Sequence, residues 1–331
     1  MPHRTSALSP ALRVTVERTI PLWYRDGAAP ALDRPAFVRA GSGVTWWGGR
    51  LAVVQDDTAF VALVDPATGI AEGVPLPVAD GVRQFGVARG NKKRKPDLES
   101  VLTLPDGRLL ALGSGSTRAR ERLLVMGDDQ LPRWIDASPL YRALRAEPSF
   151  AGSELNIEGA ALLGDRVKLF QRGNGAVVDG VAPLNATVDL SLQELLEEML
   201  RWESASTGDC RVALRSIASY SLGTLSGVAL SFTDATAWPS THPGRVAFLA
   251  AAEDSPDTYQ DGLCAGSALG FIDPDGAVGH QALRTPGGEV FRTKAEGIVF
   301  DRDDPTLAWV VLDLDDPDRP SELCSVRIVS G

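Results

Sequence analysis

The strongest constraint on the fold of this chain is an internal repeat. Five segments each begin with a Ser or Glu next to a small residue, continue as an apolar strand, pass through a tight turn and enter a second strand. Gly, Pro and Asp mark the turns, which is typical of β-hairpins. The repeat predicts an all-β fold, a five-bladed β-propeller that forms one domain over residues 1–331. The blade starts are Ser42, Glu99, Glu158, Ser226 and Glu296.

The last copy ends after three strands, whereas LRVTVERTIPL near the N-terminus alternates like a strand and belongs to no copy. We therefore expect residues 11–22 to close the last blade by pairing with residues 323–329, which removes two exposed sheet edges. The segment DLSLQELLEEMLRW predicts either an amphipathic helix outside the blades or a strand that leads into one helical turn.

The composition of the chain argues against some classes of binding partner. A net charge of −10 argues against nucleic acid, which requires a broad basic face. The chain has no apolar run of about 18 residues and no signal-like apolar segment at its start, so we expect a cytoplasmic monomer with no membrane partner. The three cysteines lie far apart and are expected to be buried, reduced thiols.

The first strands of a propeller line its axial tunnel, so the blade starts should converge. Three glutamates there would repel one another unless a cation joined them. Calcium accepts about six to eight oxygen ligands in irregular geometry and fits such a site better than magnesium. Alternatively, the glutamates bond backbone amides of neighbouring blades and act as inter-blade clasps. The predicted calcium ligands are Ser42, Glu99, Glu158, Ser226 and Glu296.

A second cluster is predicted at the rim, where the second strands end. Asp56 is a candidate for orienting a water molecule and Arg172 for holding a phosphate. The basic run at residues 92–95 either assists in phosphate binding or is a solvated loop. The other candidate ligand-binding residues are Asp57, Ser114, Asn174, Glu253 and Asp313.

The order Ser, Glu, Glu, Ser, Glu at the blade starts resembles the calcium-activated nucleotidases, or soluble apyrases. The segment GGRLAVVQDDTA is similar to the first-blade motif of that family and places Asp56 on one of its aspartates, while Gln55 replaces another. Arg172 matches an arginine of the third blade. The resemblance implies a five-bladed propeller with one calcium ion in its tunnel. The EG blade starts also resemble phytase-like and SdiA-regulated propellers, a looser kinship.

Two functions follow from these observations. The first is a soluble propeller with calcium in its tunnel that acts as a scaffold, binding a small molecule or a protein at its rim. The alternative is a calcium-dependent hydrolase of a nucleotide or another phosphate-bearing small molecule. We favour the scaffold, because free calcium is scarce in the cytosol and the resembled enzymes work in secretory or extracellular settings.

Overall fold

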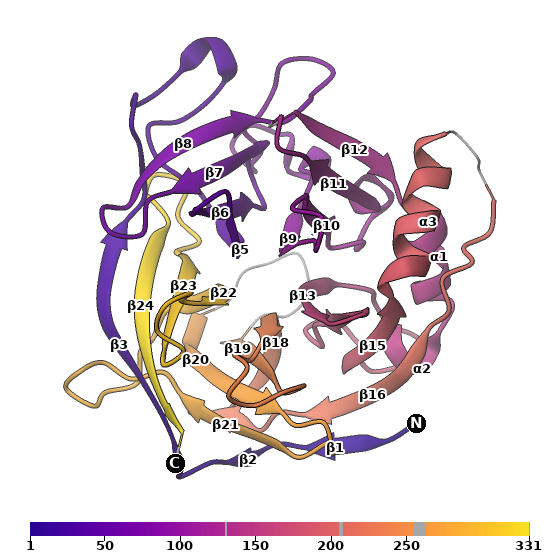
Figure 1. The fold of residues 1–331 in the computed structure, drawn as a ribbon, viewed down its shortest axis with the longest axis vertical. Coiled ribbons are helices and arrows are strands. Elements are labelled where there is room, and N and C mark those ends of the chain that lie inside the picture. The colour runs from indigo at the N-terminus through magenta and orange to yellow at the C-terminus, as the bar shows by residue number, and fades with distance from the viewer. Residues whose placement is uncertain (130, 205–207, 255–262, 331) are drawn as a thin grey trace.

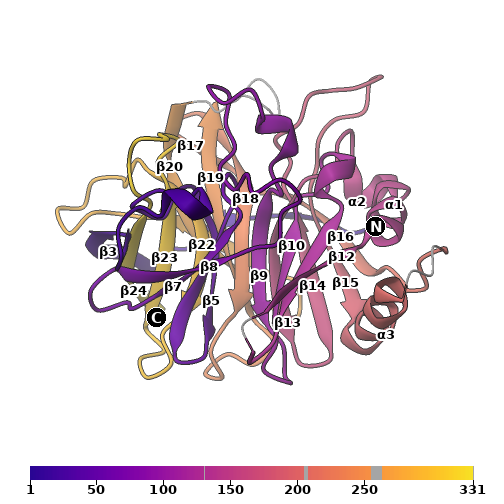
Figure 2. The same cartoon turned by 90° about the horizontal axis from the view of Figure 1, so that it is seen from above.

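The computed structural model describes residues 1–129, 131–204, 208–254 and 263–330. Its strands form five sheets around a central axis, which confirms the prediction of an all-β, five-bladed propeller (Figure 1). The four main strands of each blade pair in antiparallel order from the axis outward, and they run between the two faces of the ring (Figure 2). Blade one contains β5 (Gly41–Trp47), β6 (Arg50–Gln55), β7 (Phe60–Val64) and β8 (Ile70–Pro75), with the short β4 (Trp23–Tyr24) outside; blade two contains β9 (Leu98–Thr103), β10 (Leu109–Gly113), β11 (Arg122–Met126) and β12 (Pro132–Asp136).

The remaining blades include strands from the N-terminal segment. Blade three contains β13 (Ile157–Leu163), β14 (Arg166–Gln171), β15 (Asn185–Ser191) and β16 (Arg215–Ser221), with β1 (His3–Thr5) at its outer edge. Blade four contains β18 (Val228–Ala237), β19 (Val246–Asp254), β20 (Leu263–Ile272) and β21 (Val278–Ala282), with β17 (Thr224–Leu225) at the inner edge and β2 (Ala7–Leu8) at the outer edge. Blade five contains β22 (Lys294–Phe300), β23 (Leu307–Asp313), β24 (Glu322–Ser330) and β3 (Leu12–Pro21).

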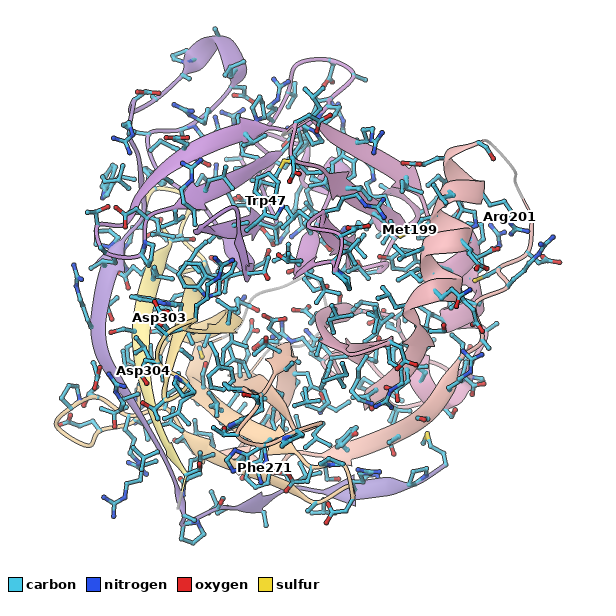
Figure 3. All side chains as sticks on the ribbon, viewed as in Figure 1. Trp47, Met199, Arg201, Phe271, Asp303 and Asp304 are labelled. Atoms are coloured by element: carbon cyan, nitrogen blue, oxygen red, sulfur yellow. The ribbon has the colours of Figure 1, made fainter. Side chains whose placement is uncertain are left out.

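The hydrophobic core consists of layers between the blades. Each of five clusters of buried side chains joins two neighbouring blades. In one of them Phe170 of blade three packs against Phe232 of blade four, which in turn packs against Phe248. Side chains fill the spaces between the sheets, with Trp47 in blade one and Phe271 in blade four (Figure 3). Because both faces of a blade are covered, the strands are nearly continuous apolar runs in the sequence.

The N-terminal strand closes the ring as predicted. β3 pairs antiparallel with β24, with Val16 opposite Val326 and Val14 opposite Ile328. Leu12, Val14 and Val16 alternate as buried residues with the more exposed Arg13, Thr15 and Glu17. The N-terminal segment also runs along the outside of blades three and four, where β1 and β2 pair parallel with β16 and β21 (Figure 1).

The predicted amphipathic helix is confirmed as α3 (Leu192–Glu203), which lies outside blade three with α1 (Ser138–Arg145) and α2 (Pro148–Ala151) (Figure 1). The side chain of Ser191 caps it by accepting a hydrogen bond from the amide of Glu194. Its buried side chains, which include Met199, pack on the core layer between blades two and three.

The inner strand of blade four, β18, begins at Val228, close to the predicted start near residue 226, but Ser226 does not occupy the position of the other predicted blade-start residues. Ser226 is exposed, adopts a positive φ of 54° and lies in the turn between β17 and β18. The SG pair at this point therefore belongs to a tight hairpin turn. In β18 the residue that corresponds to the other blade starts is Thr233, as the pairing register shows below.

Two minor predictions have different outcomes. Cys210, Cys264 and Cys324 are free, but only Cys324 is fully buried, so the prediction of buried thiols is wrong for the other two. Among the described residues, no helix has both the length and the apolar character needed to cross a membrane.

Candidate functional site

Each inner strand carries a β-bulge at the residue that turns toward the tunnel. In β5 the pairing register shifts between Gly41 and Gly43, and in β18 it shifts between Phe232 and Asp234. A bulge inserts one unpaired residue and re-aims its side chain. The neighbouring inner strands contact one another all the way around the axis, so the bulges meet at one end of the tunnel, here called the tunnel mouth. The bulged residues are Ser42, Glu99, Glu158, Thr233 and Glu296.

The glycines after three of these residues allow the inner strands to approach closely. A Cβ atom on Gly297 would lie 2.8 Å from the Cα of Gly43, and one on Gly159 would lie 2.9 Å from the backbone of Asp234. Real Cβ atoms do not come so close to backbone, so close packing around the axis explains the SG pair at residue 42 and the EG pairs of the repeat.

Hydroxyl groups clasp neighbouring blades at the tunnel mouth. Ser42 donates a short hydrogen bond to the carbonyl of Leu98 in blade two, and Thr233 donates one of 2.6 Å to the carbonyl of Ala295 in blade five. Within the described ranges, no backbone amide of a neighbouring blade donates a hydrogen bond to Glu99, Glu158 or Glu296. The predicted glutamate clasps are thus replaced by hydroxyl clasps.

A carboxylate clasp that the sequence did not reveal is Asp234. Its Oδ2 accepts a hydrogen bond of 2.8 Å from the amide of Ile298 in blade five. The carboxylate also accepts from the amides of Ala235 and of Ala160, which lies in blade three. Burial nevertheless raises the pKa of Asp234 well above its usual value. One side chain therefore joins blades three, four and five.

Arg172 is held between carboxylates. Its guanidinium donates to Glu253 at 2.5 Å and lies 3.4 Å from Glu158. Burial opposes the charge, yet Glu158, Glu296 and Glu253 raise the pKa of Arg172 above its usual value. Asn156 donates to Glu158 at 2.6 Å and to Asn174, a predicted ligand-binding residue, at 3.3 Å. The predicted cluster of Arg172, Glu253 and Asn174 is therefore assembled, but as an internal network.

Lys294 neutralises carboxylates of blade five in the same way. Its ammonium group lies 3.0 Å from Glu296, 3.0 Å from Asp315 and 3.9 Å from Asp313. Burial, followed by repulsion from Glu158, raises the pKa of Glu296 to about 8. Glu296 Oε2 is buried and has no hydrogen-bond partner among the described atoms.

The basic run of residues 92–95 is not simply a solvated loop, because Lys95 is buried in blade two. Its ammonium group donates to Asp56 at 2.5 Å and lies 2.6 Å from Asp97. Arg120 contacts the other oxygen of Asp97 at 2.7 Å, and Ser114 donates to that oxygen at 2.5 Å. Asp56 and Ser114 are thus brought together around Asp97, and both have partners.

Glu99 differs from these groups because no described cation contacts it directly, and Lys95 attracts it only from a longer distance. It is 8% exposed, and it makes no hydrogen bond or ion pair with any residue that the structure describes. Burial, followed by repulsion from Asp97 and Glu158, raises the pKa of Glu99 well above its usual value. Its carboxylate oxygen lies within 4.8 Å of those of Asp56 and Asp97, and no other predicted calcium ligand belongs to this close group. Buried polar groups without partners are rare in native proteins.

Carboxylates outnumber cations in this tunnel-mouth network. The described cations are Lys95, Arg120, Arg172 and Lys294, each with at least one carboxylate partner. The raised pKa values of Glu99 and Glu296 reflect both burial and the unbalanced negative charge. The carboxylates are Asp56, Asp97, Glu99, Glu158, Glu253, Glu296, Asp313 and Asp315.

A cleft of about 820 Å³ opens beside the network, on blade one and the Asp313–Asp318 loop of blade five. Within it, Arg39 donates a short hydrogen bond to Asp57 Oδ2, whereas Asp57 Oδ1 is buried without a hydrogen-bond partner among the described residues. Burial, with repulsion from Asp56, raises the pKa of Asp57 to about 7. The charged lining residues are Arg39, Asp56, Asp57, Arg89, Lys92, Lys95, Asp313, Asp315, Asp316 and Asp318, and Phe37 and Phe85 add apolar surface.

Comparison of the chain with protein families gives one match, to the model of a family of unknown function, DUF6929, over residues 37–328. The chain belongs to the DUF6929 family. The matched range includes all five inner strands and the whole tunnel-mouth network, but the closing strand β3 lies before it. No curated protein matches the chain.

Several solved structures resemble this DUF6929 protein at low identity. Glutaminyl cyclase from Myxococcus xanthus is 11% identical with a TM-score of 0.46, and each chain covers 100% of the other. A mannose phosphorylase from Leishmania mexicana is 14% identical with a TM-score of 0.45, covering 94% of this chain and 88% of its own. Arabinanase Arb43A from Bacillus subtilis is 9% identical with a TM-score of 0.42, and the match covers 88% of this chain and 94% of the arabinanase chain. Likenesses at this level carry no argument about function, and the resemblance to the nucleotidases stays a prediction.

Sequence reasoning missed three charged residues of the network, Asp97, Arg120 and Lys294, and considered Lys95 only as part of the basic run of residues 92–95. A signal was present for two of them, because Asp97 and Lys294 stand two residues before the bulged Glu99 and Glu296. Residues two apart on a strand point to the same side of the sheet. Gln55, at the position of a family aspartate, is fully buried and bonds the backbone of Arg39 and Phe60, so its role is structural.

Proposed function

We propose that this protein is a binding propeller that holds a calcium ion at its tunnel mouth and a small polar ligand in the adjoining cleft. The observation that carries the proposal is the surplus of buried carboxylates, above all Glu99, which has no partner among the described residues. An uncompensated buried charge is unfavourable, so a bound cation would relieve a cost that the protein alone does not offset.

The donor atoms of the tunnel mouth fit calcium, which prefers oxygen ligands and tolerates irregular geometry. Glu296 Oε2 is a buried acceptor without a hydrogen-bond partner among the described residues, and Glu99 makes no hydrogen bond or ion pair with them. Ser42 and Thr233 donate their protons to carbonyl groups and so retain lone pairs for a cation. These residues, with Glu158, would hold the ion, which would supply a fixed positive charge at the mouth of the cleft.

The cleft suits a small polar ligand, because its lining presents both signs of charge beside the rings of Phe37 and Phe85. Its volume falls within the range of about 300–1,000 Å³ that is usual for small-molecule sites. Asp57 Oδ1 offers a buried acceptor that lacks a donor among the described residues.

The geometry supports binding over hydrolysis. Arg172 is engaged by Glu158 and Glu253 and does not line the cleft, so its guanidinium is poorly placed to hold a phosphate there. Asp56 lines the cleft but accepts a hydrogen bond from Lys95, which competes with a water molecule for that oxygen. No observation on the described residues favours the hydrolase alternative.

Calcium titration of the wild type, Glu99→Gln and Glu203→Gln tests the proposal. Glu203 is exposed on α3, outside the blades, and serves as the matched control. Calcium should raise the melting temperature of the wild type and of Glu203→Gln by mass action. Glu99→Gln should melt higher than the wild type in the absence of calcium, because it removes an unpartnered buried charge, and should lose most of the calcium shift. A wild type that does not respond to calcium, or an undiminished shift in Glu99→Gln, would contradict the proposal.

A further inference from the structure

A second cavity lies at the opposite end of blades three and four from the tunnel mouth. It has a volume of about 230 Å³ and is lined by the ends of β13 and β14 near Leu163 and Arg166. The register of this hairpin places Leu163 opposite Arg166 at the turn and Ile157 opposite Gln171 at the tunnel mouth, so the two sites are a strand length apart. The cavity is independent of the site proposed above.

The lining of this cavity is basic, although the protein as a whole carries a net charge of −10. Arg166 and Lys168 share one buried carboxylate, Asp189, which accepts from Arg166 at 2.9 Å and makes a shorter contact with Lys168. Arg166 also lies 4.0 Å from the exposed Asp165, which is outside the lining. Asp273 also lines the cavity, but it is paired with Arg245 at 2.6 Å, and Arg245 lies outside the lining. The cations of the cavity therefore exceed the acids that neutralise them.

The third cation, Arg4, has no acceptor in the described part of the chain. No hydrogen bond or ion pair with a described residue involves its guanidinium, although the side chain is half-buried. Its position is determined by the pairing of β1 with β16, which sets Arg4 opposite Tyr220. Gly276 makes room for it, since a Cβ atom there would lie 2.3 Å from a guanidinium nitrogen of Arg4.

Two hydroxyl groups complete the lining. Thr187 and Tyr220 lie 3.1 Å apart through their oxygens and both face the cavity. Burial raises the pKa of the Tyr220 hydroxyl, and the hydrogen bond with Thr187 and, to a smaller extent, the charge of Arg4 partly offset this effect. Guanidinium, ammonium and hydroxyl donors around a small volume are the groups that recognise phosphate oxygens.

We propose that this cavity binds a tetrahedral phosphate group, with Arg4, Arg166 and Lys168 as its cationic contacts. The N-terminal strand β1 then has a binding role, because it carries Arg4 over the cavity. The volume of about 230 Å³ is smaller than that of most small-molecule sites and suits inorganic phosphate or the phosphate of a small monoester.

Isothermal titration with inorganic phosphate and with methyl phosphate, against sodium chloride at matched ionic strength, tests this inference. The informative variant is Arg4→Gln, which should fold normally because Arg4 has no described protein partner. Arg13→Gln, an exposed arginine on β3, is the control. We expect Arg4→Gln to weaken phosphate binding by about tenfold or more, and Arg13→Gln to leave it unchanged.

Tighter binding of methyl phosphate would identify a phosphorylated small molecule as the ligand, and tighter binding of inorganic phosphate would identify the free ion. The inference is overturned if the wild type binds neither compound at millimolar concentration, or if Arg4→Gln binds as the wild type does. A variant lacking residues 1–11 provides a second readout, because it removes Arg4 and should lose phosphate binding while retaining the tunnel-mouth response to calcium.

Discussion

Replacement of Asp234 by alanine tests the carboxylate clasp that joins three blades. The carboxylate accepts from the amides of Ile298 in blade five and Ala160 in blade three. Each buried amide left without an acceptor costs about 1–3 kcal/mol, so the two inter-blade bonds predict a loss of roughly 2–6 kcal/mol. That is a large share of the ~5–15 kcal/mol by which folded domains are usually stable.

The measurement is urea-induced unfolding of the wild type, Asp234→Ala and Asp234→Asn. The asparagine variant keeps one acceptor oxygen and the shape of the side chain, so its free energy of unfolding should lie between the other two. Asp165→Ala, whose side chain is 97% exposed, should unfold like the wild type. A free energy for Asp234→Ala within about 1 kcal/mol of the wild type, at an equal m-value, would refute the clasp.

Two further predictions concern ring closure and pH. Deleting residues 1–11 should leave a folded ring. Deleting residues 1–22 also removes Leu12, Val14 and Val16, whose burial contributes roughly 5–9 kcal/mol to the stability of the folded state. This longer deletion should abolish the cooperative melting transition seen by circular dichroism. A native-like melt of the longer deletion would show that β3 is dispensable. The pKa of Asp57 is raised to about 7 in the folded state, so the folded protein binds more protons than the unfolded one between pH 4 and pH 7. Its free energy of unfolding should therefore fall by up to about 4 kcal/mol as the pH rises from 4 to 7. Asp57→Asn should flatten this part of the profile in urea unfolding at several pH values, and an unchanged slope would contradict the assignment.

The architecture could be predicted from the sequence because its signals are local. Alternating buried residues in β3 and hairpin turns between apolar runs mark strands without knowledge of distant contacts. The missing fourth strand of the last copy and the unassigned N-terminal strand together predicted the closure that β3 and β24 make. Glu99, Glu158 and Glu296 were found because each opens such a strand.

The position of Thr233 could not be predicted in the same way. The SG pair at Ser226 matches the start of the first blade, yet it forms a turn, and the bulge lies further along β18. A bulge is defined by which residues pair across strands, and the pairing of β18 with β19 joins segments separated by a long hairpin loop.

Only the tertiary structure decided which charges at the tunnel mouth are paired and which are not. The repeat determined that glutamates surround the axis, but a sequence does not state which charges share a buried volume. Folding brings Lys95, Arg172 and Lys294 from separate blades to the tunnel mouth, where each neutralises particular carboxylates, and leaves Glu99 without a partner in the part of the chain that the structure describes. The energy of a charge in a protein depends on burial and on distances of a few ångströms to other charges. Both quantities exist only once the blades have closed into a ring.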